Sequence, residues 1–205
     1  MAGKTFTRDE FVKKYTPFVT QITKGTGLLP GTVLAQGILE SSGNWNTGGQ
    51  WLVGGSQLSQ EANNFFGIKA DPSWKGRVYN INTGEYTPSG QAYTVNAGFR
   101  AYDSVEDSIR DHANFLMTNS RYKTAGVFDA KTVADQAAAI KKAGYATAPD
   151  YASVVTGVFN QIQGLMSTAK TYVKKNIGFL VISIGALAVA GVGIYIIVKN
   201  RKKLK

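Results

Sequence analysis

The chain has 205 residues and an ordinary hydrophobic content, enough for one globular domain with an appendage. It contains no cysteine, so a disulfide framework, a thiolate metal site and a cysteine nucleophile are excluded. The formal net charge is +10, but eight of the 23 basic residues and none of the 13 acidic ones lie in residues 170–205. Residues 1–169 are therefore nearly neutral, and we expect no nucleic-acid partner. No apolar stretch follows the first five residues, so no cleavable signal peptide is expected.

A first helix is predicted from a capping box, Thr7-x-x-Glu10, which is followed by apolar residues at helical spacing. Pro17 lies inside this pattern and is expected to kink or break the helix.

A second helix is predicted over residues 30–43, and it ends with a carboxylate. Pro30 suits the first turn of a helix, and Gly43 is a natural stop. Glu40 falls in the last turn, where the negative end of the helix dipole and apolar neighbours both raise the pKa of a carboxyl. Such a carboxyl suits a general acid near neutral pH. The alternative is that Glu40 points into solvent without a chemical role.

Residues 44–55 have the composition of a loop and carry Trp45 and Trp51. Aromatic side chains beside a candidate acid suit stacking on sugar rings, but they serve equally well as a lid on a core. A short helix is predicted from Ser56 or Ser59 to Phe65, followed by core residues.

Two strands, over residues 78–83 and 92–99, are predicted to form a hairpin joined across residues 83–90. Glu85 therefore lies in or beside this hairpin, where a solvated charge is the default interpretation.

Further helices are predicted after the hairpin. Asp103 or Ser104 is expected to cap the first of them, and Asp129 the alanine-rich one that Gly144 ends. His112 is the single histidine, which argues against a histidine-based triad or a histidine-rich metal site. We interpret it as a packing or surface residue, and we expect no metal and no cofactor.

Residues 177–198 form an uncharged, strongly apolar run with basic residues on both sides. As a helix, this run would be about 33 Å long, enough to cross the hydrocarbon core of a bilayer. The sequence thus predicts one C-terminal transmembrane helix, with the basic tail weakly favoured on the cytoplasmic side.

Six short segments of the chain can be compared with known families as an ordered set. They are Ala35-Gln-Gly-Ile-Leu-Glu-Ser-Ser42, Asn63-Asn-Phe-Phe-Gly-Ile-Lys69, Trp74-Lys-Gly76, Thr83-Gly-Glu-Tyr86, Phe99-Arg-Ala-Tyr-Asp-Ser104, and Ala143-Gly-Tyr-Ala-Thr147 with Tyr151. Together they resemble the bacterial and phage N-acetylglucosaminidases of glycoside hydrolase family 73, which include wall-digesting domains of flagellar-rod proteins and autolysins. The first segment also occurs in lysozyme-like transglycosylases, so the order of all six carries the resemblance.

The resemblance implies a mainly α, lysozyme-like α+β fold with a small β-hairpin lobe over a sugar-binding cleft. It implies hydrolysis of the β-1,4 bond after N-acetylglucosamine in peptidoglycan, with Glu40 as general acid and Glu85 as the second acidic residue. The positions matching the cleft are Tyr145, Tyr151, Asn64 and Phe65, and Trp45 and Trp74 are further candidate sugar contacts. The family's usual Asp after Ala-Thr is replaced by Ala148, and residues 42–63 are longer than the usual pattern.

Three functions remain open on this sequence. The first is a membrane-anchored peptidoglycan glucosaminidase, which we place in the internal membrane of a phage virion or, alternatively, in a bacterial cytoplasmic membrane. Its partners would be glycan strands, the lipid bilayer through residues 177–198, and other virion or membrane proteins. The second is a muramidase or lytic transglycosylase working with Glu40 alone, and the third is a non-catalytic wall-binding protein.

The corresponding organisation is a lysozyme-like domain over residues 1–165, a basic juxtamembrane linker over 166–176, a transmembrane helix over 177–198 and a basic tail over 199–205. Whether Glu85 acts as nucleophile or base depends on the separation of the two carboxyl groups, and a substrate acetamido group is a further candidate nucleophile.

Overall fold

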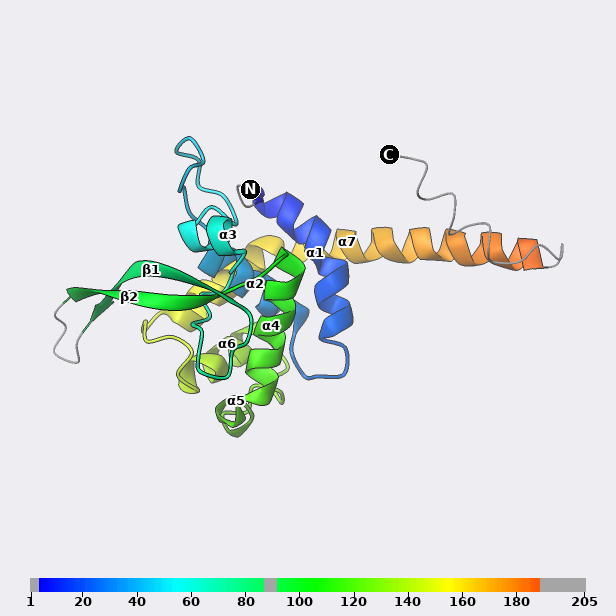
Figure 1. The fold of residues 1–205 in the computed structure, drawn as a ribbon. Helices are drawn as coiled ribbons and strands as arrows, with labels where there is room; N and C mark the ends of the chain where they lie inside the picture. The colour runs from blue at the N-terminus through cyan, green and yellow to red at the C-terminus, as the bar shows by residue number, and fades with distance from the viewer. Residues whose placement is uncertain (1–3, 87–91, 189–205) are drawn as a thin grey trace.

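The computed structural model describes residues 4–86 and 92–188. A helical body carries a two-stranded hairpin that extends from one side, and the last helix leaves on the other (Figure 1). The elements in chain order are α1 (Arg8–Ile22), α2 (Pro30–Ser41), α3 (Gln57–Ala62), β1 (Arg77–Tyr86), β2 (Ala92–Ala101), α4 (Val105–Thr118), α5 (Ser120–Thr124), α6 (Val133–Lys142) and α7 (Tyr151–Ala188).

Helix α2 lies at the centre of the body and contacts α1, α4, α6 and α7. It is apolar around most of its circumference, so it can be buried on several sides at once. Leu34 and Ile38 pack into a core shared with α1, while Ala35 packs into a second core shared with α6. The predicted helix is confirmed, including Pro30 in its first turn.

Helix α1 begins at the predicted capping box, because Thr7 and Glu10 exchange the two reciprocal hydrogen bonds. The expectation at Pro17 was a kink or a break, and the break is wrong, because the helix runs on through Pro17. The buried residues Tyr15, Thr16 and Val19 hold both sides of Pro17 against the body, which outweighs the loss of one backbone hydrogen bond.

Strands β1 and β2 are antiparallel, with Arg77 opposite Ala101 and Tyr86 opposite Ala92. Both strands are longer than predicted, so Glu85 lies within β1, opposite Tyr93. The Glu85 side chain is outside what the structure describes. The base of the hairpin is joined to the body by backbone bonds from Ala70 to Gly98 and from Arg100 to Ile68, of 2.9 and 3.0 Å.

The predicted cap is confirmed for α4 and is wrong for α6. Ser104 caps α4, accepting a hydrogen bond from the backbone of Asp107 at 3.1 Å. Thr132, not Asp129, caps α6, so that expectation is wrong. Asp129 instead belongs to the turn after α5, where its N–H donates to Gly126. Gly144 follows α6 with a φ of 81°, as a glycine after a helix end does.

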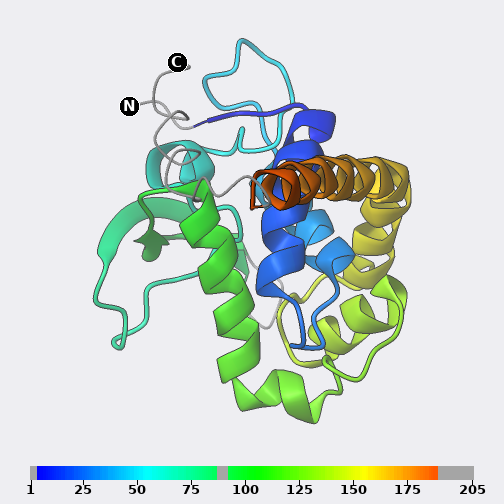
Figure 2. The same ribbon diagram turned by 90° about the vertical axis from the view of Figure 1, so that its right-hand side faces the viewer.

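Helix α7 covers the body and then extends away from it, passing across α1 (Figure 2). Val155, Ile162 and Met166 on this helix are buried. Its backbone is helical across the predicted boundary at residue 165 and through the predicted linker at 166–176. Within the described ranges, no helix combines the length and apolar character needed to cross a bilayer. Residues 189–198 of the predicted span, and the tail at 199–205, lie outside those ranges.

Candidate active site

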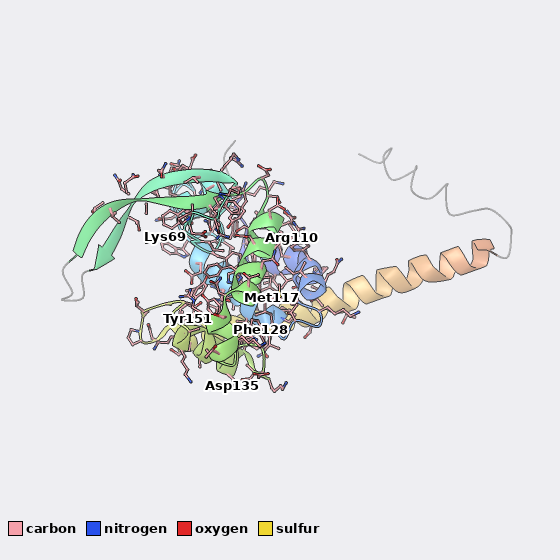
Figure 3. The ribbon with its side chains drawn as sticks, turned by 60° about the horizontal axis from the view of Figure 1, so that its bottom comes forward. Lys69, Arg110, Met117, Phe128, Asp135 and Tyr151 are labelled. Atoms are coloured by element: carbon pink, nitrogen blue, oxygen red, sulfur yellow. The ribbon has the colours of Figure 1, made fainter. Side chains whose placement is uncertain are left out.

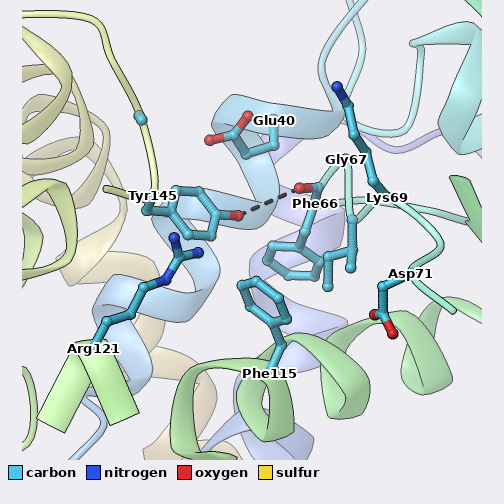
Figure 4. A pocket seen from close by; sticks show the side chains of 10 residues that line it. Glu40, Phe66, Gly67, Lys69, Asp71, Phe115, Arg121 and Tyr145 are labelled. Atoms are coloured by element: carbon cyan, nitrogen blue, oxygen red, sulfur yellow. Dashed lines mark hydrogen bonds between the residues drawn. The ribbon is translucent and has the colours of Figure 1, made fainter. Parts of the chain in front are cut away.

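A pocket of about 500 Å³ opens beside the C-terminal end of α2. Its wall combines one residue of α2, a segment after α3, and residues of α4, α5 and the loop after α6 (Figure 4). The lining residues are Glu40, Phe66, Gly67, Ile68, Lys69, Asp71, Phe115, Arg121, Tyr145 and Ala146.

Glu40 is half-buried in the last turn of α2. Burial among apolar neighbours raises the pKa of its carboxyl from 4.5 to about 7. The rise has the direction expected from the sequence, and its cause is the loss of solvation. A carboxyl with this pKa still holds its proton in half of the molecules at neutral pH and can release it to a substrate.

Tyr145 follows Gly144, and its ring points toward the backbone of Phe66 in the pocket wall (Figure 4). Its hydroxyl donates a hydrogen bond to the carbonyl oxygen of Phe66 at 3.3 Å. Burial, followed by the charge of Glu40, raises the pKa of this hydroxyl well above its ordinary value. Tyr145 is therefore a neutral hydrogen-bonding group beside the candidate acid.

Tyr151 is not in the pocket wall, although it was expected to contact substrate. It is 5% exposed, and its hydroxyl accepts a hydrogen bond of 2.7 Å from the buried side chain of Gln36. Its ring centroid lies 5.8 Å from that of Tyr145. Tyr151 supports Tyr145 from inside the body, because the start of α7 packs under the loop that follows α6.

Asn64 and Phe65, expected in the segment that lines the cleft, are buried behind the wall of this pocket rather than on it. The amide of Asn64 donates to the carbonyls of Ile68 and Arg100, and its oxygen accepts from the backbone of Phe66 and Ile68. Phe65 is fully buried and stacks on Phe11. These contacts shape the segment whose next residues line the pocket.

Trp45 and Trp74 are half-buried, and neither lines the pocket. The indole N–H of Trp74 donates to the carbonyl of Arg77 at 2.9 Å, and the Arg100 guanidinium lies 4.8 Å from its ring. Trp51, in the same loop as Trp45, is 71% exposed.

The pocket holds charged residues that the sequence did not single out. Arg121 comes from α5, and Lys69 and Asp71 follow α3 in the chain. Lys69 lies on the side of the hairpin (Figure 3). Asp71 forms an ion pair with Arg100, and hydrogen bonds from Ser73, then Arg100, hold the pKa of its carboxyl far below the ordinary value. Arg121 is far from Lys69 and Asp71 in the chain, so no local pattern placed the three in one pocket.

His112 lies under the pocket and is fully buried. Its ring stacks on Phe66, with centroids 3.9 Å apart, and meets Tyr145 edge-on. Burial lowers the pKa of the imidazole to about 3, so it is neutral at physiological pH. The interpretation as a packing histidine is confirmed by this position. In the described part of the chain, no cluster of histidine and acidic side chains has the geometry to hold a metal ion.

A helical body, a two-stranded hairpin and a protonatable glutamate at a helix end define a lysozyme-like, helix-rich α+β hydrolase fold. The family model described as mannosyl-glycoprotein endo-beta-N-acetylglucosaminidase matches residues 16–164. The chain therefore belongs to the glucosaminidase family.

Curated relatives include the peptidoglycan hydrolase FlgJ of Salmonella typhimurium, which is 42% identical over 110 residues, or 53% of this chain and 34% of the relative. The exo-glucosaminidase LytG of Bacillus subtilis is 34% identical over 106 residues, or 50% of this chain and 36% of the relative. The chain thus spans about a third of the length of these two relatives.

Solved structures with the same fold include the catalytic domain of the autolysin Auto from Listeria monocytogenes. It has a TM-score of 0.64 and 29% identity, covering 82% of this chain and 90% of that one. The glycoside hydrolase domain of FlgJ from Salmonella typhimurium has a TM-score of 0.57 and 28% identity, covering 84% and 99%.

Proposed function

We propose that this chain hydrolyses the β-1,4 bond after N-acetylglucosamine in peptidoglycan. The observation that carries the proposal is Glu40, a carboxyl with a pKa of about 7 that faces a pocket of about 500 Å³ in a chain of the glucosaminidase family. The relative FlgJ is a peptidoglycan hydrolase by name, which supports peptidoglycan as the substrate. The relative LytG is an exo-glucosaminidase by name, which supports glucosaminidase activity.

In the proposed reaction, Glu40 gives its proton to the leaving glycosidic oxygen as the bond from that oxygen to the anomeric carbon breaks. Glu85, carried on β1 of the hairpin, is the proposed second carboxylate. It either accepts a proton from the attacking water or bonds to the anomeric carbon before water displaces it. In the first case Glu85 ends with the proton of the water, and exchange with solvent returns a proton to Glu40. In the second case Glu40 takes the proton of the water that displaces Glu85. In both cases the water oxygen ends on the anomeric carbon. The substrate acetamido group is the alternative nucleophile.

Product analysis tests the bond that is cleaved. Purified cell walls are digested with the unchanged chain and with Glu40→Gln, and the fragments are identified by mass spectrometry. New reducing ends on N-acetylglucosamine, made by the unchanged chain only, support the proposal. Reducing or anhydro ends on N-acetylmuramic acid would mean a muramidase or transglycosylase, and equal or absent digestion by both proteins would mean a non-catalytic wall-binding role.

The role of Glu85 is tested separately by Glu85→Gln. A loss of about a hundredfold or more in kcat, with little change in KM, is expected for a residue that acts in the transition state. Full activity of this variant would contradict the two-carboxylate mechanism.

We also propose that residues 177–198 anchor the chain in a membrane and that the chain belongs to the internal membrane of a phage virion. The support is the uncharged apolar run and its basic flanks in the sequence. Sedimentation with membranes, lost when residues 170–205 are removed, is the expected result for the anchor. Detection of the chain in host membranes but never in purified particles would contradict the virion location.

A further inference from the structure

The charged residues that line the pocket differ in ionisation and in pairing. Glu40 is only partly ionised at neutral pH, and Asp71 is already paired with Arg100 and Ser73. Arg121 is also a charged residue of the pocket wall. Its guanidinium can therefore offer positive charge to an occupant of the pocket, although the candidate chemistry there concerns a neutral sugar bond.

Arg121 is exposed, and neutral groups position its guanidinium. One terminal nitrogen donates to the hydroxyl of Tyr122 at 2.7 Å, and the other donates to the carbonyl of Gly144 at 3.5 Å. The guanidinium lies 4.8 Å from the ring of Tyr122. The aromatic ring of Phe115 is 5.8 Å away. The ion pairs among the described residues join other arginines to carboxylates, and none of them includes Arg121.

The charge of Arg121 is also not used to tune the candidate acid. A nearby cation would lower the pKa of Glu40, whereas that pKa is raised, and burial is the cause. The guanidinium has five N–H donors in a planar fork, a geometry that matches the two oxygens of a carboxylate. Arg121 lies below Tyr145 on one side of the pocket, with Lys69 and Asp71 on the other side (Figure 4).

We propose that Arg121 binds a carboxylate of the peptide attached to the glycan strand and thereby selects peptide-bearing wall strands over neutral sugar polymers. This inference rests on the proposed function. N-acetylglucosamine carries no charge, so a cation in the wall of the pocket has no partner on a neutral polymer. The peptides of peptidoglycan carry carboxylates beside the sugar backbone, and they supply the anion that this position fits.

The test compares two substrates that differ only in charge. Solubilised wall strands are used as they are, and after their carboxylates have been converted to primary amides. The proteins are the full chain, Arg121→Gln, Arg121→Lys and the control Lys123→Gln. Lys123 is exposed on the same helix and does not line the pocket. Its variant therefore removes one positive charge near the pocket and leaves the pocket wall unchanged.

For the full chain and Lys123→Gln, amidation of the strands should raise KM about tenfold, the value of one charge-assisted pair. Arg121→Gln should show the raised KM on untreated strands and no further increase on amidated ones. Arg121→Lys should fall between, because it keeps the charge and loses the fork. The ratio between the two substrates is independent of how much of each variant is folded.

A full chain that is active but indifferent to amidation would overturn this inference and leave the proposed function intact. The same conclusion follows if Arg121→Gln loses activity equally on both substrates while keeping the response to amidation. Absence of glycosidase activity of the full chain on both substrates would overturn the proposed function, and the inference with it.

Discussion

Burial shifts the pKa values of two side chains, Glu40 and His112, in ways that experiments can test. Both lie at the pocket, Glu40 in its wall and His112 beneath Phe66. Removal from water disfavours the charged form of each, so the pKa of the carboxyl rises and that of the imidazole falls. The two shifts make opposite predictions for the pH dependence of stability.

Replacing Glu40 by Gln should remove a pH-dependent loss of stability. The pKa of Glu40 is about 7 in the folded chain against an ordinary 4.5. Between these values the folded chain binds the extra proton, so the free energy of unfolding falls as the pH rises from 4.5 to 7. We compare the free energy of unfolding of Glu40→Gln with that of the unchanged chain at two pH values. From pH ~4 to pH ~8 this difference should shift by about 2 kcal/mol in favour of Glu40→Gln, after allowing for the partial exposure of the carboxyl.

Urea unfolding at the two pH values measures this gain. A difference between the proteins that does not change with pH would mean that the Glu40 carboxyl has an ordinary pKa. The same pKa predicts that wall hydrolysis declines as the pH rises above about 7, since the general acid is then deprotonated.

His112→Phe should protect the chain against mild acid. The imidazole has a folded pKa of about 3 against 6.5, so below pH 6.5 the unfolded chain takes up the proton and the folded chain does not. The free energy of unfolding therefore falls as the pH falls from 6.5 towards 3. The phenyl ring keeps the stack on Phe66, and neither ring nitrogen has a hydrogen-bond partner among the described residues.

Between pH ~7 and ~4.5 the unchanged chain should lose about 2 kcal/mol more than His112→Phe, measured by urea unfolding. Equal losses in the two proteins would show that the imidazole already takes up its proton in the folded chain.

At the scale of elements, caps and apolar spacing in the sequence predicted that the helices exist, but they did not always predict the residue at which a helix begins. Helix α1 and helix α2 begin where a capping box and a proline predict. The cap of helix α6 is Thr132 and not Asp129, although both residue types are good caps. The choice depends on the turn after α5, which engages the backbone of Asp129 and leaves Thr132 at the helix start.

Thr132→Ala and Asp129→Ala separate these two caps. The hydroxyl of Thr132 accepts from the backbone of Asp135 at 3.1 Å, so its loss should lower the free energy of unfolding by about 1 kcal/mol. Asp129→Ala should change it by less than about 0.5 kcal/mol, because the side chain is exposed. Thermal or urea unfolding distinguishes them, and a reversed order would place the helix start at Asp129.

At the scale of the whole molecule, α7 joins the body to the C-terminal part of the chain. Its buried residues continue beyond the predicted domain boundary at 165, since Met166 and Ala169 are 5% and 7% exposed. Met166 packs in the same core as α1 and α2. The folded body therefore extends past residue 165, and a truncation at that point removes part of the core.

Met166→Ala should lower the free energy of unfolding by about 2 kcal/mol, the loss expected when a buried methionine leaves a cavity. Met117→Ala is the matched control. Met117 lies on α4 (Figure 3) and is 36% exposed, so its truncation should cost under about 0.5 kcal/mol. Equal effects of the two substitutions would show that α7 leaves the core before residue 166.

The sequence by itself determined the central helix with Glu40 at its end, the hairpin that carries Glu85 and the order of segments that marks the family. These features depend on spacing and caps within a few residues, which are local physical constraints. Roles for Glu40 and Glu85 as catalytic residues stay predictions.

Only the tertiary structure decided which side chains face the pocket. Phe66 and Tyr145 line it, whereas their near neighbours Phe65 and Tyr151 are buried behind it. Arg121 reaches the same pocket from a different helix. A residue's exposure depends on what distant segments bring against it, and no pattern along the chain encodes that contact. The burial that raises the pKa of Glu40 is such a tertiary effect.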